Sequence, residues 1–238
     1  MHLYPFKIYN PVIYKGKDLD VYKKYKTKKH SEKSGEDWNS NDPDITNLKQ
    51  TIKNHYINEQ DFTCCYCKQK IVVTHNGAWD AEHIIPKSEH PAFMFEPENI
   101  AICCKDCNGE KLAQEVLTNS GIKSRKKFLT DKKHYLIVHP HFDEYDQHIE
   151  IRQDFRIYRG KTDKGINTIT ICGLLRFGKD TNYSNVPSST LDDVTEVQSR
   201  LAKAVTLDEQ YNLLSELGDI VAQKKAEIYK LRTERRKI

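Results

Sequence analysis

The sequence predicts an α+β protein that is built around a four-cysteine metal frame and ends in a helical region. Three features of the 238-residue chain support this fold class. Two Cys-x-x-Cys pairs flank a short segment, β-branched residues are frequent in residues 134–176, and apolar residues recur at helical spacing after residue 188. Hydrophobic residues make up 37% of the chain and include 13 Tyr and 8 Phe, which is enough for a core and argues against a disordered chain.

The sequence predicts four regions. Residues 1–58 are an N-terminal part with an arm, a basic loop and a helix, and residues 59–120 are a cysteine-framed core. Residues 121–180 are a strand-rich extension, and residues 181–238 are a set of C-terminal helices. In the first region, Asp44 is placed to cap a helix that runs to about Ile57. In the third, glycine-containing turn signals separate the expected strands. In the fourth, Thr206 and Glu209 have the spacing of a capping box, so a helix is expected to start there.

Four cysteines give the strongest signal of chemistry in the chain. Cys64 and Cys67 form one Cys-x-x-Cys pair, Cys104 and Cys107 form a second, and 36 residues (68–103) separate the two pairs. Four thiolates offered as two such pairs suit a tetrahedral Zn²⁺ site with no open position. The spacing therefore predicts a structural zinc ion rather than a redox-active pair.

The chain shows no sign of export or membrane insertion. Its first residues lack the apolar core of a signal peptide, and no stretch approaches the ~20 apolar residues of a membrane span. We therefore expect a cytoplasmic protein, in which seven cysteines point to metal binding before disulfides. Cys65 and Cys103 lie beside the proposed ligands and are expected to pack as small apolar residues, as is Cys172 in a strand-like segment.

The segment between the two cysteine pairs carries a second group of polar residues. Glu82 and His83 run into Ile-Ile-Pro-Lys, Asn99 follows 16 residues after His83, and Asn108 comes directly after the last cysteine of the frame. A carboxylate and an amide oxygen are hard ligands that suit Mg²⁺ or Mn²⁺. An imidazole titrates near neutral pH and can accept a proton from water. Asp80 lies on the same strand face as Glu82 and is an alternative ligand.

This arrangement resembles the HNH endonuclease family, whose core is a β-hairpin followed by a helix around one metal ion. The resemblance covers residues 64–117, and the three pattern positions fall on His83, Asn99 and Asn108. It implies a ββα-metal core framed by the zinc site, which hydrolyses phosphodiester bonds in nucleic acid, with DNA favoured. It also implies that His83 is the general base, that Glu82 (more often Asp in the family) and Asn108 hold the catalytic metal, and that Asn99 tightens the loop and orients His83.

A narrower resemblance concerns residues 82–91, the Asn-Ile segment that begins at Asn99, and residues 137–144. They look like the HNH partner of Septu-type and retron-associated antiphage systems, in which the nuclease works beside an ATPase. This resemblance implies a role in antiviral defence with an ATPase as protein partner. Residues 137–144 are also consistent with a structural turn, because Pro140 and Asp143 suit one.

Basic residues are clustered along the chain, although the net charge is only +4. Three blocks carry an excess of lysine and arginine: residues 15–33, 105–136 and 224–238. Such blocks either converge on the phosphates of a nucleic acid or lie in solvent. Lys111, one helical turn beyond Asn108, and Lys126 and Lys127, near the expected end of the same helix, are the candidate nucleic-acid contacts.

Two other functions would also use cysteine pairs of this kind. A zinc-ribbon module that binds nucleic acid or protein without catalysis would not need the Glu82–His83 pair inside its frame. A thiol oxidoreductase would need a βαβ context, which the segment around Cys64 lacks. The apolar stripe of the last helix, from Leu207 to Leu231, is expected to pack on its own chain or to dock on the ATPase or on a second copy of the chain.

Overall fold

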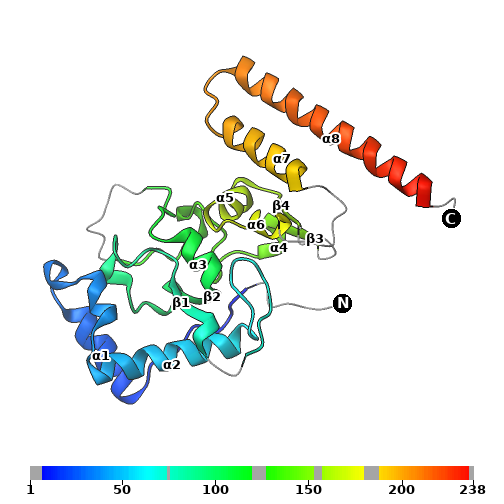
Figure 1. Cartoon of the computed structure of the whole chain (residues 1–238). Coiled ribbons are helices and arrows are strands. Elements are labelled where there is room, and N and C mark those ends of the chain that lie inside the picture. The colour runs from blue at the N-terminus through cyan, green and yellow to red at the C-terminus, as the bar shows by residue number, and fades with distance from the viewer. Residues whose placement is uncertain (1–6, 74–75, 120–126, 153–156, 180–187, 236–238) are drawn as a thin grey trace. The chain divides into compact units, whose positions relative to one another are not determined.

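The structure is a computed structural model that describes residues 7–73, 76–119, 127–152, 157–179 and 188–235 (Figure 1). It combines helices with two small sheets, which confirms the α+β class. The contacts within the chain divide it into two compact units. The first comprises residues 1–152 and 158–175, and the second comprises residues 153–157 and 176–238.

The helices follow one another as α1 (Gly16–Thr27), α2 (Pro43–Glu59), α3 (Lys105–Lys111), α4 (Tyr145–His148), α5 (Asp163–Ile171), α6 (Arg176–Lys179), α7 (Ser188–Leu201) and α8 (Leu207–Arg235). The strands are β1 (Trp79–His83), β2 (Ile100–Cys104), β3 (Ile149–Arg152) and β4 (Ile157–Gly160). Strand β1 pairs with β2, and β3 pairs with β4. Short 3₁₀ helices punctuate the loops, including one at Gly35–Asn39.

Helix α2 contacts both strands of the first sheet and supports them. It begins two residues before the expected start, because Pro43 is favoured in the first helical position and the side chain of Asp42, rather than Asp44, is the cap, accepting from the backbone N–H of Asp44 at 2.8 Å. Three side chains on one face of α2 have no exposed surface: Leu48, Ile52 and Tyr56. Burying an apolar side chain of this size stabilises the fold by about 1.5–3 kcal/mol.

The β1–β2 hairpin leads directly into α3 (Figure 1). The two strands are antiparallel, with Trp79 opposite Cys104 and His83 opposite Ile100. Helix α3 ends at Lys111, because the next residue, Leu112, adopts a φ of +46° in the left-handed region. The helix is therefore shorter than expected and does not extend toward residues 126 and 127.

Within the described residues of the expected strand-rich extension, the short strands β3 and β4 are the only strands, and residues 163–171 form a helix instead. The side chain of Thr162 caps this helix by accepting a hydrogen bond from the backbone of Gly165 at 3.3 Å. A Cβ atom at residue 165 would lie 1.9 Å from the carbonyl oxygen of His148. Gly165 therefore permits close packing rather than marking a turn, and Cys172 follows a helix rather than lying in a strand.

The second unit contains a hairpin of α7 and α8. Thr206 and Glu209 form the expected capping box, with hydrogen bonds of 3.2 Å and 3.1 Å between each side chain and the other residue's backbone N–H. Val197 of α7 and Leu213 of α8 are buried. Much of the expected α8 stripe is exposed instead, at Leu207, Tyr211, Leu214 and Val221. Among the described helices, none combines the length and the apolar composition that a membrane span requires.

Candidate functional site

Four cysteine sulfur atoms converge in the first unit. The Sγ atoms of Cys64, Cys67, Cys104 and Cys107 all lie within 4.8 Å of one another, and all four residues are buried. Zn–S bonds of about 2.3 Å in a tetrahedron require sulfur atoms about 3.8 Å apart. The Sγ atoms of Cys67 and Cys104 are 3.9 Å apart. This donor set fits a metal ion such as zinc, as the cysteine spacing predicts.

The backbone presents the sulfur atoms from two sides. After the first pair, the backbone N–H of Lys68 donates to the carbonyl of Cys64 at 3.1 Å, and Lys68 closes the tight turn with a φ of +55°. The second pair uses Cys104, the last residue of β2, and Cys107, in the first turn of α3. The backbone N–H of Cys104 also donates to the Sγ of Cys64 at 3.4 Å, which favours a thiolate there.

The electrostatics of the four thiols favour a bound cation. Burial disfavours the Cys64 thiolate, but hydrogen bonds from Cys104 and Cys107 outweigh it and lower the Cys64 pKa well below its usual range. The pKa values of Cys67 and Cys107 are raised, and the largest cause is the interaction with Cys104. Four thiolates so close together repel one another. A divalent cation removes that repulsion, and zinc binds cysteine in its deprotonated form.

The other three cysteines are buried outside this group. Burial raises the pKa values of Cys65 and Cys103, which keeps both as neutral thiols. Cys172, which follows α5, has no exposed surface. All three therefore have the buried surroundings expected of packing residues.

Two tyrosines from the extension hold the first cysteine pair in place. The hydroxyl of Tyr145 donates to the carbonyl of Tyr66 at 2.7 Å, and the hydroxyl of Tyr158 donates to the carbonyl of Cys67 at 2.6 Å. The Nζ atom of Lys68 lies 4.7 Å from the centre of the Tyr145 ring, within the range of a cation–π contact. The extension thus completes the surroundings of the cysteine frame.

His83 is the last residue of β1, and one of its ring nitrogens is held by the backbone. Its Nε2 lies 3.0 Å from the carbonyl oxygen of Met94. A carbonyl can only accept, so Nε2 carries the hydrogen and Nδ1 is the proton acceptor. Asn99 shapes the loop that supplies this carbonyl, because its Oδ1 accepts from the backbone of Ile85 at 2.8 Å and its Nδ2 donates to the carbonyl of Phe93 at 3.0 Å.

The N-terminal part of the chain covers the imidazole of His83. The Trp38 ring meets it edge to face, with 4.5 Å between the ring centres. Gly35, at the start of the same 3₁₀ helix, packs on the loop after β1, where a Cβ atom would lie 3.2 Å from the carbonyl oxygen of Lys87. Burial, and then the positive charge of Lys87, lower the pKa of His83 to about 3. The ring is therefore neutral near pH 7 and has the protonation state of a base.

The carboxylate of Glu82 is buried and ion-paired. Its Oε1 lies 2.6 Å from the Nζ of Lys111, which has no exposed surface, and it also accepts a hydrogen bond from the hydroxyl of Tyr66 at 2.9 Å. Lys111 was expected to contact phosphate, but a lysine enclosed in this way does not reach a substrate at the surface. Its position instead neutralises Glu82, and the second carboxylate oxygen of Glu82 is the one available for a cation.

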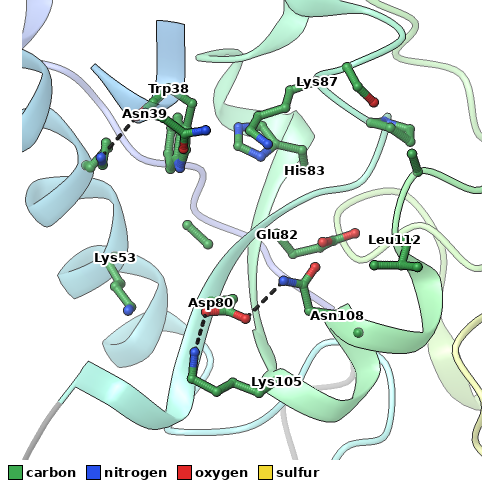
Figure 2. A pocket seen from close by; sticks show the side chains of 16 residues that line it. Trp38, Asn39, Lys53, Asp80, Glu82, His83, Lys87, Lys105, Asn108 and Leu112 are labelled. Carbon is green, nitrogen blue, oxygen red and sulfur yellow. Dashed lines mark hydrogen bonds and ion pairs between the residues drawn. The ribbon is translucent and has the colours of Figure 1, made fainter. Parts of the chain in front are cut away.

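Asp80 and Asn108 meet beside Glu82 (Figure 2). The Nδ2 of Asn108 donates to Asp80 at 2.9 Å, and Lys105 forms an ion pair with the other oxygen of Asp80 at 3.2 Å. This bond turns the amide oxygen of Asn108 away from Asp80 and toward the side of Glu82. The arrangement favours Glu82 and Asn108 as the oxygen ligands of a hard cation, with Asp80 orienting Asn108.

These groups line a pocket of about 690 Å³. The wall opposite β1 and α3 comes from the N-terminal part and includes Trp38, Asn39 and Lys53 (Figure 2). Lys49 of α2 also lines the pocket. Lys87 and Lys105 bring the lysines of the lining to four, against the two carboxylates already described. A pocket with this excess of positive charge attracts an anionic ligand.

The other two candidate nucleic-acid contacts are Lys126 and Lys127. Lys127 is exposed, lies outside α3, which ends at Lys111, and is not among the residues that line the pocket. Lys126 lies outside the described residues.

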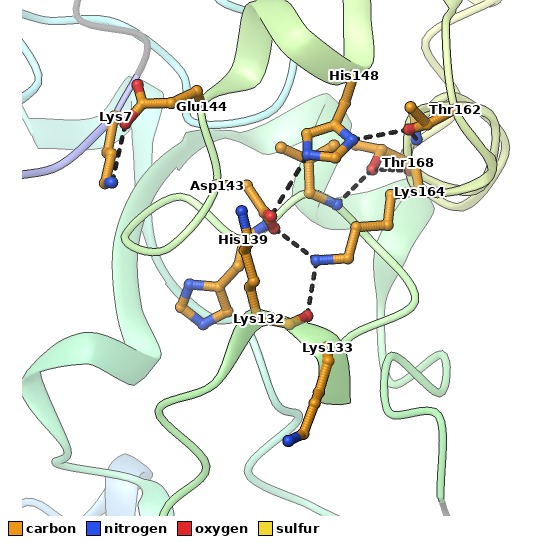
Figure 3. A network of polar contacts seen from close by, with 12 residues as sticks. Lys7, Lys132, Lys133, His139, Asp143, Glu144, His148, Thr162, Lys164 and Thr168 are labelled. Carbon is orange, nitrogen blue, oxygen red and sulfur yellow. Dashed lines mark hydrogen bonds and ion pairs between the residues drawn. The ribbon is translucent and has the colours of Figure 1, made fainter.

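Residues 137–144 form a turn around a buried carboxylate (Figure 3). One oxygen of Asp143 accepts from the backbone N–H of His139 at 2.8 Å and pairs with the Nζ of Lys164 at 2.7 Å. The Nε2 of His141 lies 2.8 Å from the carbonyl oxygen of Ile100, at the start of β2. These contacts fasten β2 to the extension. Residues 137–144 therefore form the structural turn that the sequence allowed.

The residues of the site that were not predicted from the sequence include Trp38, Tyr66 and the four lysines of the pocket lining, among them Lys53. Tyr66 could have been suspected, because any residue inside a Cys-x-x-Cys pair lies next to the frame. Trp38 is one of only two tryptophans in the chain, and it stands in a polar segment where a large aromatic residue is unexpected. No sequence signal distinguishes Lys53 from the other lysines.

Comparisons with known protein families, with curated proteins and with solved structures found no match for this chain. The function of this chain is therefore inferred from the geometry of its site and from the resemblance described above.

Proposed function

We propose that this protein is a metal-dependent endonuclease of the HNH type, which hydrolyses phosphodiester bonds in DNA. The observation that supports this best is the setting of His83. Its Nε2 is tied to a backbone carbonyl, which leaves Nδ1 as the proton acceptor in a lysine-lined pocket that also holds Glu82 and Asn108. A neutral base, oxygen ligands and an anion-attracting wall are the three components that such a hydrolysis needs.

In this proposal His83 takes the proton from the water that attacks the phosphorus atom. The carbonyl of Met94 accepts from Nε2, which keeps the ring in one tautomer and fixes its orientation. Trp38 shields the ring from solvent and keeps it neutral before the reaction. Base catalysis of this kind contributes about 10²–10⁴-fold to the rate.

Glu82 and Asn108 would hold a Mg²⁺ or Mn²⁺ ion. Such an ion, when bound, stabilises the negative charge that develops on the phosphate and on the leaving oxygen. Lys111 balances the buried charge of Glu82. Asp80 orients the amide of Asn108 through the hydrogen bond to its Nδ2. The four-cysteine frame would hold a structural zinc ion that fixes β2 and α3, and with them Asn108.

We further propose that the nuclease is the effector of an antiphage defence system and acts beside an ATPase. This step depends on the resemblance of residues 82–91 and 137–144. It is tested by tagging the full-length protein in its native host and identifying the proteins that co-purify. Recovery of an ATPase in stoichiometric amounts supports the proposal, and recovery of the nuclease alone contradicts it.

A cleavage assay tests the catalytic proposal. Zinc-loaded full-length protein is incubated with plasmid and linear DNA in Mg²⁺, in Mn²⁺ and with EDTA, beside the variants His83→Ala and His134→Ala. His134 is a partly exposed histidine outside the pocket lining and serves as the matched control. We expect cleavage only with the divalent cations, and a loss of about 10²–10⁴-fold for His83→Ala alone. Binding without cleavage under any of these conditions favours the non-catalytic zinc-ribbon function instead.

A further inference from the structure

The hairpin and α3 are not the only elements that supply lysines to the pocket. The wall formed by the N-terminal part adds Lys53 of α2. Lys49 and Lys53 lie one turn apart on α2 and both line the pocket. Lys49 is engaged, because its Nζ donates to the carbonyl of Trp38 at 3.0 Å. Lys53 is half-buried and points into the pocket near Asp80 and Lys105 (Figure 2).

Lys87 occupies the other end of the same pocket. It follows Pro86 in the loop after β1 and lies beside the imidazole of His83 (Figure 2). Like Lys53 it is half-buried. Within the described ranges of the chain, neither lysine forms an ion pair or a side-chain hydrogen bond. Removing part of a charged group from water without giving it a partner is unfavourable, so each position is suited to an incoming anion.

The two lysines lie at two separate places in the pocket that holds the proposed reaction centre. Lys53 lies on the α2 side and Lys87 lies beside His83, while Glu82 and Asn108 lie on the side of the pocket away from α2 (Figure 2). Lys105 is already paired with Asp80, and Lys111 is enclosed with Glu82. Lys53 and Lys87 are therefore the cations of this pocket that remain available to a ligand with more than one negative charge.

We propose that Lys53 and Lys87 bind two different phosphates next to the scissile phosphate, so that one nucleic-acid strand runs through the pocket between α2 and α3. This inference rests on the proposed nuclease function and adds to it the path of the substrate. Contacts of this kind recognise the backbone and carry no sequence information. The ligand is a phosphodiester chain, and the experiment distinguishes DNA from RNA.

The test measures binding without cleavage. Full-length His83→Ala protein, loaded with zinc and without added Mg²⁺ or Mn²⁺, is titrated into fluorescently labelled single-stranded DNA, double-stranded DNA and RNA of equal length at several salt concentrations. Lys53→Ala and Lys87→Ala are each introduced into this parent. Lys23→Ala is the matched control, because Lys23 is an exposed lysine of α1 that does not line the pocket. Zinc content and circular dichroism show that each variant is folded.

We expect each pocket variant to weaken binding by about fivefold and to reduce the slope of log K against log[salt] by about 0.7–0.9. The loss should be the same for every sequence of a given nucleic acid, and the nucleic acid that shows it is the substrate class. On an oligonucleotide with uncharged methylphosphonate linkages, the two variants should bind as their parent does.

Two results would overturn the inference. One is that Lys53→Ala and Lys87→Ala bind every nucleic acid as Lys23→Ala does, and the other is that their defect persists on the uncharged backbone. Failure of the nuclease proposal shows separately, as an absence of cleavage by the wild-type protein with Mg²⁺ or Mn²⁺.

Discussion

The hydroxyl of Tyr66 donates a hydrogen bond of 2.9 Å to Oε1 of Glu82 and thereby connects the cysteine frame to the pocket. Tyr66 lies between two cysteines of the frame, and both residues of this contact are buried. A metal ion bound at the four cysteines would therefore hold Tyr66 in place and, through this hydrogen bond, help to position the carboxylate of Glu82.

Replacing Tyr66 with Phe tests this connection. The change removes a hydrogen bond to a carboxylate, which should lower the free energy of unfolding by about 1.5–3 kcal/mol. It should also raise the Mg²⁺ concentration that gives half-maximal cleavage, because Glu82 is less well positioned. Tyr135→Phe is the matched control, since Tyr135 is equally buried and its hydroxyl bonds to the carbonyl of Leu129. An equal shift in the Mg²⁺ requirement of both variants would contradict this role of Tyr66.

The cysteine frame should require all four of its ligands. Purified protein is expected to contain about one zinc ion per chain. Cys104→Ser should lose zinc and unfold at lower urea concentration, because the free energy of zinc binding is part of the folding free energy. Cys65 is buried in the same region but is not one of the four clustered cysteines, so the Cys65→Ala variant should keep its zinc. Unchanged zinc content in folded Cys104→Ser protein would exclude Cys104 as a ligand.

The Lys111–Glu82 ion pair gives a third prediction. Lys111→Met leaves a buried carboxylate without its partner and should cost about 3–5 kcal/mol of stability. Adding Glu82→Gln should recover most of this loss, because the uncompensated charge is then gone. If Glu82 also binds the catalytic cation, Mg²⁺ should raise the Tm of Lys111→Met more than that of the wild type. Additive losses in the double variant would show that the two side chains do not act as a pair.

Stability should fall in mildly acidic solution because of His141. Burial lowers the pKa of His141 to about 4, so the folded protein binds fewer protons there than the unfolded chain, whose histidines have a pKa of about 6.5. The contribution is fully present above about pH 6.5 and is lost toward pH 4, by about 1.4 kcal/mol per pH unit.

The check is urea unfolding of the wild type and of His141→Gln between pH 7 and pH 5, with zinc content followed in parallel. Zinc loss at acid pH affects both proteins alike, so the difference between the two curves isolates the histidine. His134→Gln, at a partly exposed position, should keep the slope of the wild type. If the free energy of unfolding fell equally with pH in the wild type and in His141→Gln, His141 would not be the cause of the acid sensitivity.

The sequence predicted the parts of the fold that depend on short-range geometry. The spacing of Cys64, Cys67, Cys104 and Cys107 is set by ligand geometry, and the capping box at Thr206 is set within one turn. The helix over residues 163–171 was missed because its Ile and Thr residues favour strands, while the Thr162 cap and the packing of Gly165 decide for a helix.

The site was predictable in its residue types but not in its pairings. Glu82, His83 and Asn108 all line the pocket, whereas Lys111 lies inside the protein. A lysine one turn beyond Asn108 has the same sequence signature whether it points outward or inward. The difference depends on Glu82, which meets it only once β1 and α3 have packed together. The wall of Trp38 and Lys53 was likewise hidden, because it comes from a distant part of the chain.

The hydrogen bond between Tyr158 and Cys67 links residues that are 91 positions apart. A contact of such high sequence separation carries a loop-closure cost, because the long intervening segment must close before the contact contributes. During synthesis, the first cysteine pair leaves the ribosome well before the tyrosine that covers it. The newly made core therefore passes through a stage in which all four cysteines are present but incompletely enclosed, and in which they remain accessible to zinc, to competing metals and to oxidants.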